Sequence, residues 1–329
     1  MKNALITFKA KLVNSVIQPF AKQTTIQGSM ASVNIPARSI SLPSRPHPNS
    51  VKLEAELAKL KTWESSSASS NRFSGAEDIQ AGLVMLAELF NCIQEFIQSP
   101  ITQQAFQHQH SYMVEKALDG SVGLLDVCSS ARDLLLSMKG HVQDLQSAFR
   151  RRGVNSCIES NILAYISFRK KAKKDINKSL QELKRLENNV ESFLLDIEHH
   201  LFFVLSMIRE ARIKAICIFQ SLVLFLAAPL TARNTNGWSI IISKVIRSGS
   251  SAKASRKTQK VFNEVENVDV ALLCINGRIR KGDAKVELQE VQGRLETLNV
   301  SMRGLEAKID CMFRCLIQNR VSLLNLVAF

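Results

Sequence analysis

Proline, aromatic residues and acidic residues near the N-terminus are all scarce in this chain of 329 residues. Seven prolines occur, and none lies between Pro100 and Pro229, so long uninterrupted helices can form in that interval. Aromatic residues make up 6% of the chain, which is little for a β-sandwich. The composition favours an all-α protein, and a hydrophobic content of 46% is enough for a sizeable core.

Motifs of catalysis and metal binding are also lacking. The sequence contains no Gly-rich phosphate loop, no HExxH and no GxSxG. His199 and His200 are adjacent, so on a helix they point about 100° apart and cannot chelate one metal ion together. His108 and His110 are two residues apart and share no helix face either. We interpret both pairs as surface or interhelical polar residues, and we expect no enzyme activity, metal or cofactor.

The seven cysteines are odd in number and mostly lie singly in apolar surroundings. This usage favours reduced core residues of an intracellular protein over a disulfide framework. Cys311 and Cys315 form the one close pair and would share a helix face. Because no His or further Cys follows nearby, we interpret the pair as core packing rather than metal ligands.

The formal net charge is +14, and half of it comes from a stretch without any acid before Glu54. Residues 1–29 are basic, so they fit either a transit peptide or a variable extension that precedes a natural start at Met30. Residues 31–50 are rich in Pro, Ser and Arg, and we expect residues 1–50 to be disordered. This segment contains either plain linker or candidate phosphorylation sites at Ser39, Ser41 and Ser44.

Two heptad seams indicate long helices that each bury one stripe. One seam runs through Ala284, Leu288, Val291, Leu295, Leu298, Met302, Leu305, Ile309, Met312 and Leu316. The other runs through Ile176, Leu180, Leu183, Val190, Leu194, Ile197, Leu201, Val204 and Ile208, with Glu187 in one slot. We predict helices over 173–212 and 284–325 that pack against other helices of the same chain, with each other as the favoured partners, within an elongated bundle of long antiparallel helices spanning 51–329.

Further helices are predicted on both sides of the first seam. Their ranges are 51–63, 79–98, 103–106, 113–118, 124–150, 158–168, 238–246 and 261–274. We expect the helix from Lys173 to continue into the apolar run Ile216–Leu230. That run is shorter than the roughly 20 residues of a membrane span and contains Gln220, which favours a buried central helix.

Two basic clusters are candidates for binding an anionic partner. They consist of Arg150, Arg151 and Arg152, and of Arg169, Lys170, Lys171, Lys173 and Lys174. If the chain folds back after residue 153, the clusters share one end of the bundle and could bind anionic lipid, with about 1 kcal/mol per cation. The alternative is a solvated helix end that interacts with the helix dipole. Nucleic acid is disfavoured because no aromatic residues are interleaved for stacking.

Several segments together resemble a plant-specific family of unknown function that is related to the BYPASS-type proteins. They are ARSISLPSRPHPNS (37–50), LAKLKTWESSSASS (57–70), ALDGSVGLLDVCSSARDLLLSMKGHVQDLQSAFRRRG (117–153), SFRKKAKKDINKSL (167–180) and RVSLLNL (320–326). The resemblance covers roughly residues 31–329. At Gly140 the chain departs from it, because the family tends to carry an acidic helix-former there.

The resemblance implies an all-helical protein of land plants without known catalytic activity, whose BYPASS-type relatives are associated with root and shoot development. We therefore expect a non-catalytic regulatory or scaffold protein with an unknown protein partner. A peripheral membrane protein is the first alternative, and an enzyme acting on a small signal molecule is the second. We expect a cytoplasmic location, possible association with membranes, and no plastid import.

Overall fold

The computed structural model describes residues 48–69, 75–108, 111–151, 155–189, 199–227, 263–276 and 285–328. The chain divides into the units Met1–Arg45 and Pro46–Phe329, and every described residue belongs to the second unit. The described part consists of helices and short turns, without strands, which confirms the all-α prediction. Its helices are α2 (Pro48–Ser69), α3 (Ala76–Ile97), α4 (Pro100–His108), α5 (Ser111–Arg150), α6 (Asn155–Asn188), α7 (His199–Ala227), α9 (Glu264–Asn276) and α10 (Lys285–Ala328).

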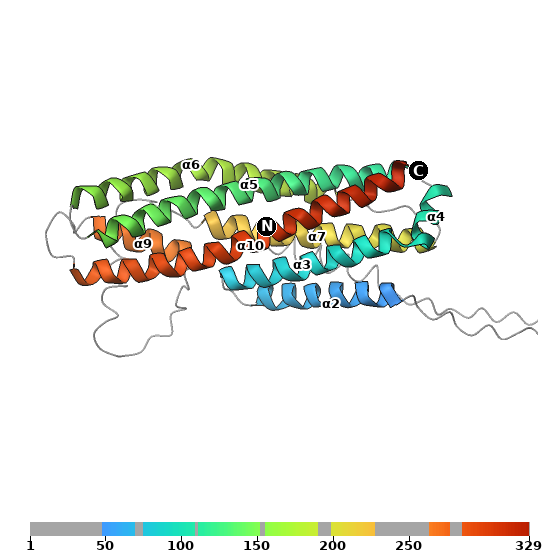
Figure 1. Cartoon of the computed structure of the whole chain (residues 1–329), viewed down its shortest axis with the longest axis horizontal. Helices are drawn as coiled ribbons and strands as arrows, with labels where there is room; N and C mark the ends of the chain where they lie inside the picture. Colours follow the sequence, from blue (N-terminus) through green and yellow to red (C-terminus); the bar gives the residue numbers. More distant parts are fainter. Residues whose placement is uncertain are drawn as a thin grey trace, which may run out of the picture. The chain divides into compact units, whose positions relative to one another are not determined.

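The seam of the last helix is confirmed by its burial. In α10 the side chains from Val291 to Leu316 that make up the seam are each at most 3% exposed. The partner predicted for this seam was wrong, however, because α10 packs chiefly against α5 and α3 rather than against the other seamed segment (Figure 1). A heptad specifies that a stripe is buried, but it does not specify which helix covers it.

The other seam is not one helix. The segment predicted as 173–212 ends at Asn188, where Asn189 forms a turn, and a separate helix α7 begins at His199. The paired asparagines are poor helix formers, which is consistent with an end at this point. α6 and α7 pack against each other and against α5, so the two halves of the seam bury their stripes in the same core.

The predicted break between 118 and 124 is absent, since α5 continues through Gly120 and Gly123. These glycines permit close packing instead. A Cβ atom at Gly123 would collide with the side chain of Leu186 in α6, and one at Gly120 would collide with the guanidinium of Arg212 in α7. The absence of side chains at Gly120 and Gly123 therefore lets α6 and α7 approach α5 closely. The packing energy gained in this way outweighs the low helix propensity of glycine.

The apolar run of α7 lies in the core. Ile216, Phe219, Leu222, Val223 and Leu226 are each at most 3% exposed. Within the described ranges, no helix is both long and apolar enough to cross a membrane. The prediction of a buried central helix is confirmed up to Ala227, and the remainder of the run lies outside the described residues.

Helix boundaries elsewhere differ modestly from the predictions. α2 continues through Ser69, although we predicted that it ends at Trp63. Pro100 follows the end of α3, as predicted, and it also begins α4, in a position where proline is well tolerated because its missing N–H is not needed. Residues 1–50 were predicted to be disordered, but α2 begins at Pro48, so the prediction is wrong for residues 48–50; residues 1–47 and the predicted helix 238–246 lie outside the described residues.

Candidate functional site: a buried ion pair and two charged helix faces

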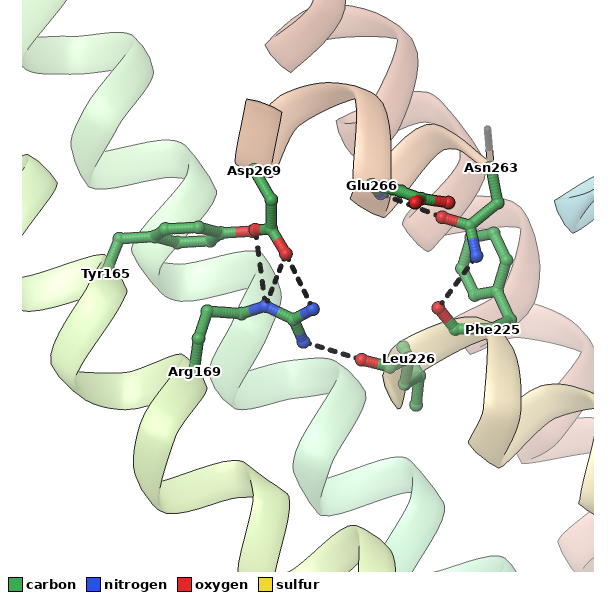
Figure 2. A network of polar contacts seen from close by, with 7 residues as sticks. All are labelled: Tyr165, Arg169, Phe225, Leu226, Asn263, Glu266 and Asp269. Atoms are coloured by element: carbon green, nitrogen blue, oxygen red, sulfur yellow. Dashed lines mark hydrogen bonds and ion pairs between the residues drawn. The ribbon is translucent and has the colours of Figure 1, made fainter. Parts of the chain in front are cut away.

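The most concentrated group of buried polar side chains joins α6 to α9. Arg169 in α6 donates from Nη2 to Asp269 Oδ2 at 2.8 Å and from Nε to the same carboxylate at 3.2 and 3.3 Å. Tyr165, one turn earlier, donates its hydroxyl to Asp269 Oδ1 at 2.8 Å. The Arg169 and Asp269 side chains are 2% and 3% exposed, and the arginine and tyrosine converge on the carboxylate (Figure 2).

The same group caps the end of α7. Arg169 donates from Nη1 to the carbonyl oxygen of Leu226 at 2.6 Å, and Asn263 donates from Nδ2 to that of Phe225 at 3.2 Å. Both carbonyls belong to the last turn of α7, where no intrahelical partner remains. Asn263 also caps the start of α9, because its Oδ1 accepts the N–H of Glu266 at 2.8 Å (Figure 2). The network thus ties α6, α7 and α9 together.

Burial and pairing act in opposite directions on this site. Burial raises the pKa of Asp269, and the nearby charge of Arg169 opposes that increase. Burial lowers the pKa of Arg169, but Asp269 and Tyr165 together raise it by more, so the pKa lies above its ordinary value. Burial, and then the negative charge of Asp269, raise the pKa of Tyr165 well above its usual range. The geometry supports a permanently charged arginine held by a carboxylate, which is a structural arrangement.

Arg169 therefore does not belong to the exposed basic cluster that the sequence indicated. It lies on the buried stripe of α6, which contains Ile158, Ile162, Tyr165, Ala172, Ile176 and Leu183. An arginine in a slot of an apolar stripe was the signal available in the sequence, but the run of cations around it obscured that signal. Asp269 is likewise set among apolar residues of α9, between Val268 and Leu272.

The two basic clusters do not share one end of the bundle. Arg150 and Arg151 lie where α5 ends, whereas Lys170 and Lys174 lie 15 and 19 residues after α6 begins at Asn155. A helix rises about 1.5 Å per residue, so the lysines lie roughly 22–28 Å farther along. Arg150 reaches Glu296 at 3.7 Å, and Arg152 lies outside the described residues. The predicted single patch is thus separated into two places.

The lysines of α6 remain as an exposed group. Lys170, Lys171, Lys173 and Lys174 are all exposed, and so is Lys178, which our sequence analysis did not include. Within the described residues, no ion pair joins any of these exposed lysines to a carboxylate. Most of the buried and half-buried arginines and lysines, by contrast, form an ion pair. These lysines are available to an external partner.

The outer surface of α5 carries the opposite charge, which our sequence analysis missed. We define the acidic stripe as Asp119, Asp126, Asp133 and Asp144, all of which are exposed. The first three recur every seven residues and the fourth follows eleven residues later, so all four lie on one side of the helix. No ion pair within the described ranges involves these four aspartates. Arg132, which is next to Asp133 in the sequence, pairs with Asp310 of α10 instead.

The histidine and cysteine predictions can be compared with the structure where side chains are described. His200 lies between helices, with Nε2 at 2.9 Å from Thr102 Oγ1 and its ring stacked on Phe96 at 5.4 Å, as predicted. Cys315 is buried and Cys311 is partly buried, which agrees with core packing. In the described part of the chain, no cluster of His, Cys, Asp and Glu has the arrangement of a metal site. The serines proposed for phosphorylation lie outside it.

Comparison with known proteins identifies a family. The family model described as Protein BPS1 matches residues 82–326, which is more than half of the chain. The match agrees with the resemblance to BYPASS-type proteins and covers α5, α6, α7, α9 and nearly all of α10. Neither the curated proteins nor the solved structures contain a significant match.

Proposed function

Because the chain belongs to the Protein BPS1 family, we propose that it is a non-catalytic scaffold that regulates plant root and shoot development. This family is not known as a family of enzymes, and the helical fold is compatible with a protein that works by binding. The developmental role is taken from the BYPASS-type resemblance. We propose that the scaffold acts in the cytoplasm.

The observation that carries the scaffold role is the division of polar groups between interior and surface. Inside, Tyr165, Arg169 and Asp269 are bonded to one another, and Arg169 also donates to the end of α7. Outside, the lysines of α6 and the acidic stripe of α5 have no ion-pair partner within the described residues. A rigid bundle with structural polar groups inside and uncommitted charge outside is suited to presenting a binding surface.

A complementation experiment tests this proposal. Lys171, Lys174 and Lys178 are changed to Gln in a chain expressed in plants that lack it, and Lys61→Gln with Arg314→Gln serves as the control at exposed positions of α2 and α10. We expect both variants to fold and melt as the parent does, because exposed charges contribute little to stability. The α6 variant should fail to restore normal roots and shoots, and the control should restore them. Full restoration by the α6 variant would contradict a scaffold role for this surface.

Docking on an anionic membrane is a second candidate, which is favoured by the density of exposed lysines on α6. Each cation near such a surface contributes about 1 kcal/mol, so four neutralised lysines should remove several kcal/mol of binding to phosphatidylserine vesicles. Lys170, Lys171, Lys173 and Lys174 changed to Gln test this directly. Equal vesicle binding by parent and variant at low salt would reject the membrane candidate.

A further inference from the structure

The contact between α5 and α6 has an inner and an outer side. Gly123 and His141 of α5 lie on the contact line, where they meet Leu186 and Phe168 of α6. Residues three positions earlier on α5 turn inward, since Gly120 faces Arg212 of α7. Residues three positions later turn by about 60° to the other side, because each residue advances about 100° around a helix. Asp126 and Asp144 are those residues, so the acidic stripe borders the contact line on its outer side.

α6 follows the same rule. Tyr165 lies three residues before Phe168 and turns inward to Asp269 of α9, whereas Lys171 lies three residues after Phe168 and turns outward. We define the lysine stripe as Lys171, Lys174 and Lys178, which follow one another at helical spacings of three and four. The acidic stripe and the lysine stripe therefore lie on the same outer face, one on each side of the α5–α6 contact line.

The register of the two helices is fixed by the same contacts. Gly123 and His141 are separated along α5 by as many residues as Phe168 and Leu186 are along α6, so the antiparallel helices stay in step. Asp133 is consequently level with residue 176, midway between Lys174 and Lys178 and next to the exposed Asp175, which the three lysines of the stripe outnumber. These charges do not form ion pairs with each other within the described chain, although they lie at the same height. Each stripe is open to a partner.

We propose that a second copy of this chain docks on this face as a two-fold dimer. If the two-fold axis runs parallel to α5 and α6, the α5 side of each face lies over the α6 side of the other, and every residue keeps its height. By the same register, Asp126 and Asp144 are level with residues 183 and 165, about 7–9 Å along the axis beyond Lys178 and Lys171. Asp133 of one copy then lies between Lys174 and Lys178 of the other. An axis across the helices would place like charges opposite each other, which costs affinity. The face is therefore complementary to itself in one orientation.

The neighbouring acids also explain why a second copy fits better than a membrane. An anionic bilayer that approached this face would meet the acidic stripe together with the lysines, and repulsion would oppose attraction. Ser130 and Ser137 are exposed on α5 next to the acidic stripe, and such small side chains leave room for a facing helix. The proposal goes beyond the scaffold role and does not depend on it, since it concerns the isolated protein.

Charge reversal provides the test. One variant carries Asp126→Lys, Asp133→Lys and Asp144→Lys, and the other carries Lys171→Glu, Lys174→Glu and Lys178→Glu. Sedimentation equilibrium of the full chain at low salt, over micromolar concentrations, should show a dimer for the parent, which weakens as salt screens the charges. In each variant alone like charges face each other, so the dissociation constant should rise at least about 100-fold. Mixed together, the two variants should form a heterodimer within about tenfold of the parent affinity.

Controls separate this result from misfolding and from general charge effects. Both variants should show the circular dichroism and melting of the parent. The pair Glu54→Lys with Glu88→Lys, and the pair Lys61→Glu with Arg314→Glu, reverse exposed charges on other helices and should leave the dimer unchanged. Two separate outcomes overturn the proposal: a monomeric parent at low salt, or a mixture of the variants that stays monomeric. A monomeric parent whose vesicle binding depends on the lysine stripe would assign the face to membranes.

Discussion

Removing either partner of the buried Arg169–Asp269 pair should lower the free energy of unfolding. The loss should depend on pH when Arg169 is removed but not when Asp269 is removed. In Asp269→Leu the guanidinium stays in a site where it is 2% exposed, and it cannot lose its proton. An uncompensated buried charge of this kind costs about 3–5 kcal/mol at any pH between 5 and 7. The hydroxyl of Tyr165 also loses its acceptor, which adds to the cost.

In Arg169→Met the remaining carboxyl can escape by binding a proton. Burial already raises the pKa of Asp269, and Arg169 opposes this, so its removal raises the folded-state pKa further. A carboxyl whose folded pKa lies above its unfolded value of about 3.9 loses stability as pH rises through that window. Holding it protonated costs about 4 kcal/mol at pH 7 and about 1.5 kcal/mol at pH 5, at about 1.4 kcal/mol per pH unit.

Denaturant unfolding at pH 5 and pH 7 measures both effects, with Arg314→Met as a control at an exposed arginine. The cost of Arg169→Met should shrink at pH 5, and that of Asp269→Leu should not. The double variant should cost less than the sum of the single variants, because the charges leave together, although the carbonyl of Leu226 stays without Arg169. Equal, pH-independent losses below about 1 kcal/mol would refute the desolvated ion pair.

Four other changes have defined outcomes in melting or thiol-reactivity experiments. Gly123→Ala should destabilise the protein by about 1–3 kcal/mol, because the added methyl group would collide with Leu186. Gly140→Ala should stabilise the protein by about 0.5–1 kcal/mol, because nothing would lie within 4 Å of the added Cβ. An equal effect of both substitutions would contradict the close-packing argument. Leu298→Asp places a charge in the α10 seam and should cost several kcal/mol; a parent-like melting curve would show that the seam is not buried in solution. Burial raises the pKa of Cys128 to about 12 and that of Cys315 to about 11, so each thiol should lower stability above pH 9 by about 1.4 kcal/mol per pH unit, and Cys128→Ala should remove the Cys128 share of the measured slope.

The sequence was sufficient to predict which side of α10 is buried, because burial of a stripe depends only on the spacing along one helix. It was not sufficient to predict the partners, α5 and α3, because a leucine stripe packs equally well on many apolar stripes. The polar ties that select α5 involve single residues far apart in sequence, such as Arg132 with Asp310 at 2.5 Å and Lys139 with Glu306. Neither pair has a local pattern that announces it.

The predicted break in α5 was wrong for a related reason, namely that the sequence does not show which helices pack against its glycines. Gly120 and Gly123 weaken a helix locally, and propensity alone favoured a break between residues 118 and 124. The cost is outweighed by the contacts that the missing side chains allow with Arg212 and Leu186, which belong to helices far along the chain. Gly140 has no such neighbour, so there the propensity argument stands and substitution should help.

The candidate site shows the same limit for charge. The sequence contains five cations within six residues, and their density suggested one patch. The helix separates them by angle: Arg169 turns into the core toward Asp269, while Lys171 and Lys174 turn outward. The number of cations in a segment is therefore a poor guide to the charge that a partner meets. The position of the acidic stripe relative to the lysines depends on the register of α5 on α6, which places Asp133 level with the lysines. A surface that is predicted to be basic from the sequence of α6 therefore carries both signs of charge in the folded protein. An alternating surface selects partners by orientation as well as by sign, which is the property expected of a scaffold.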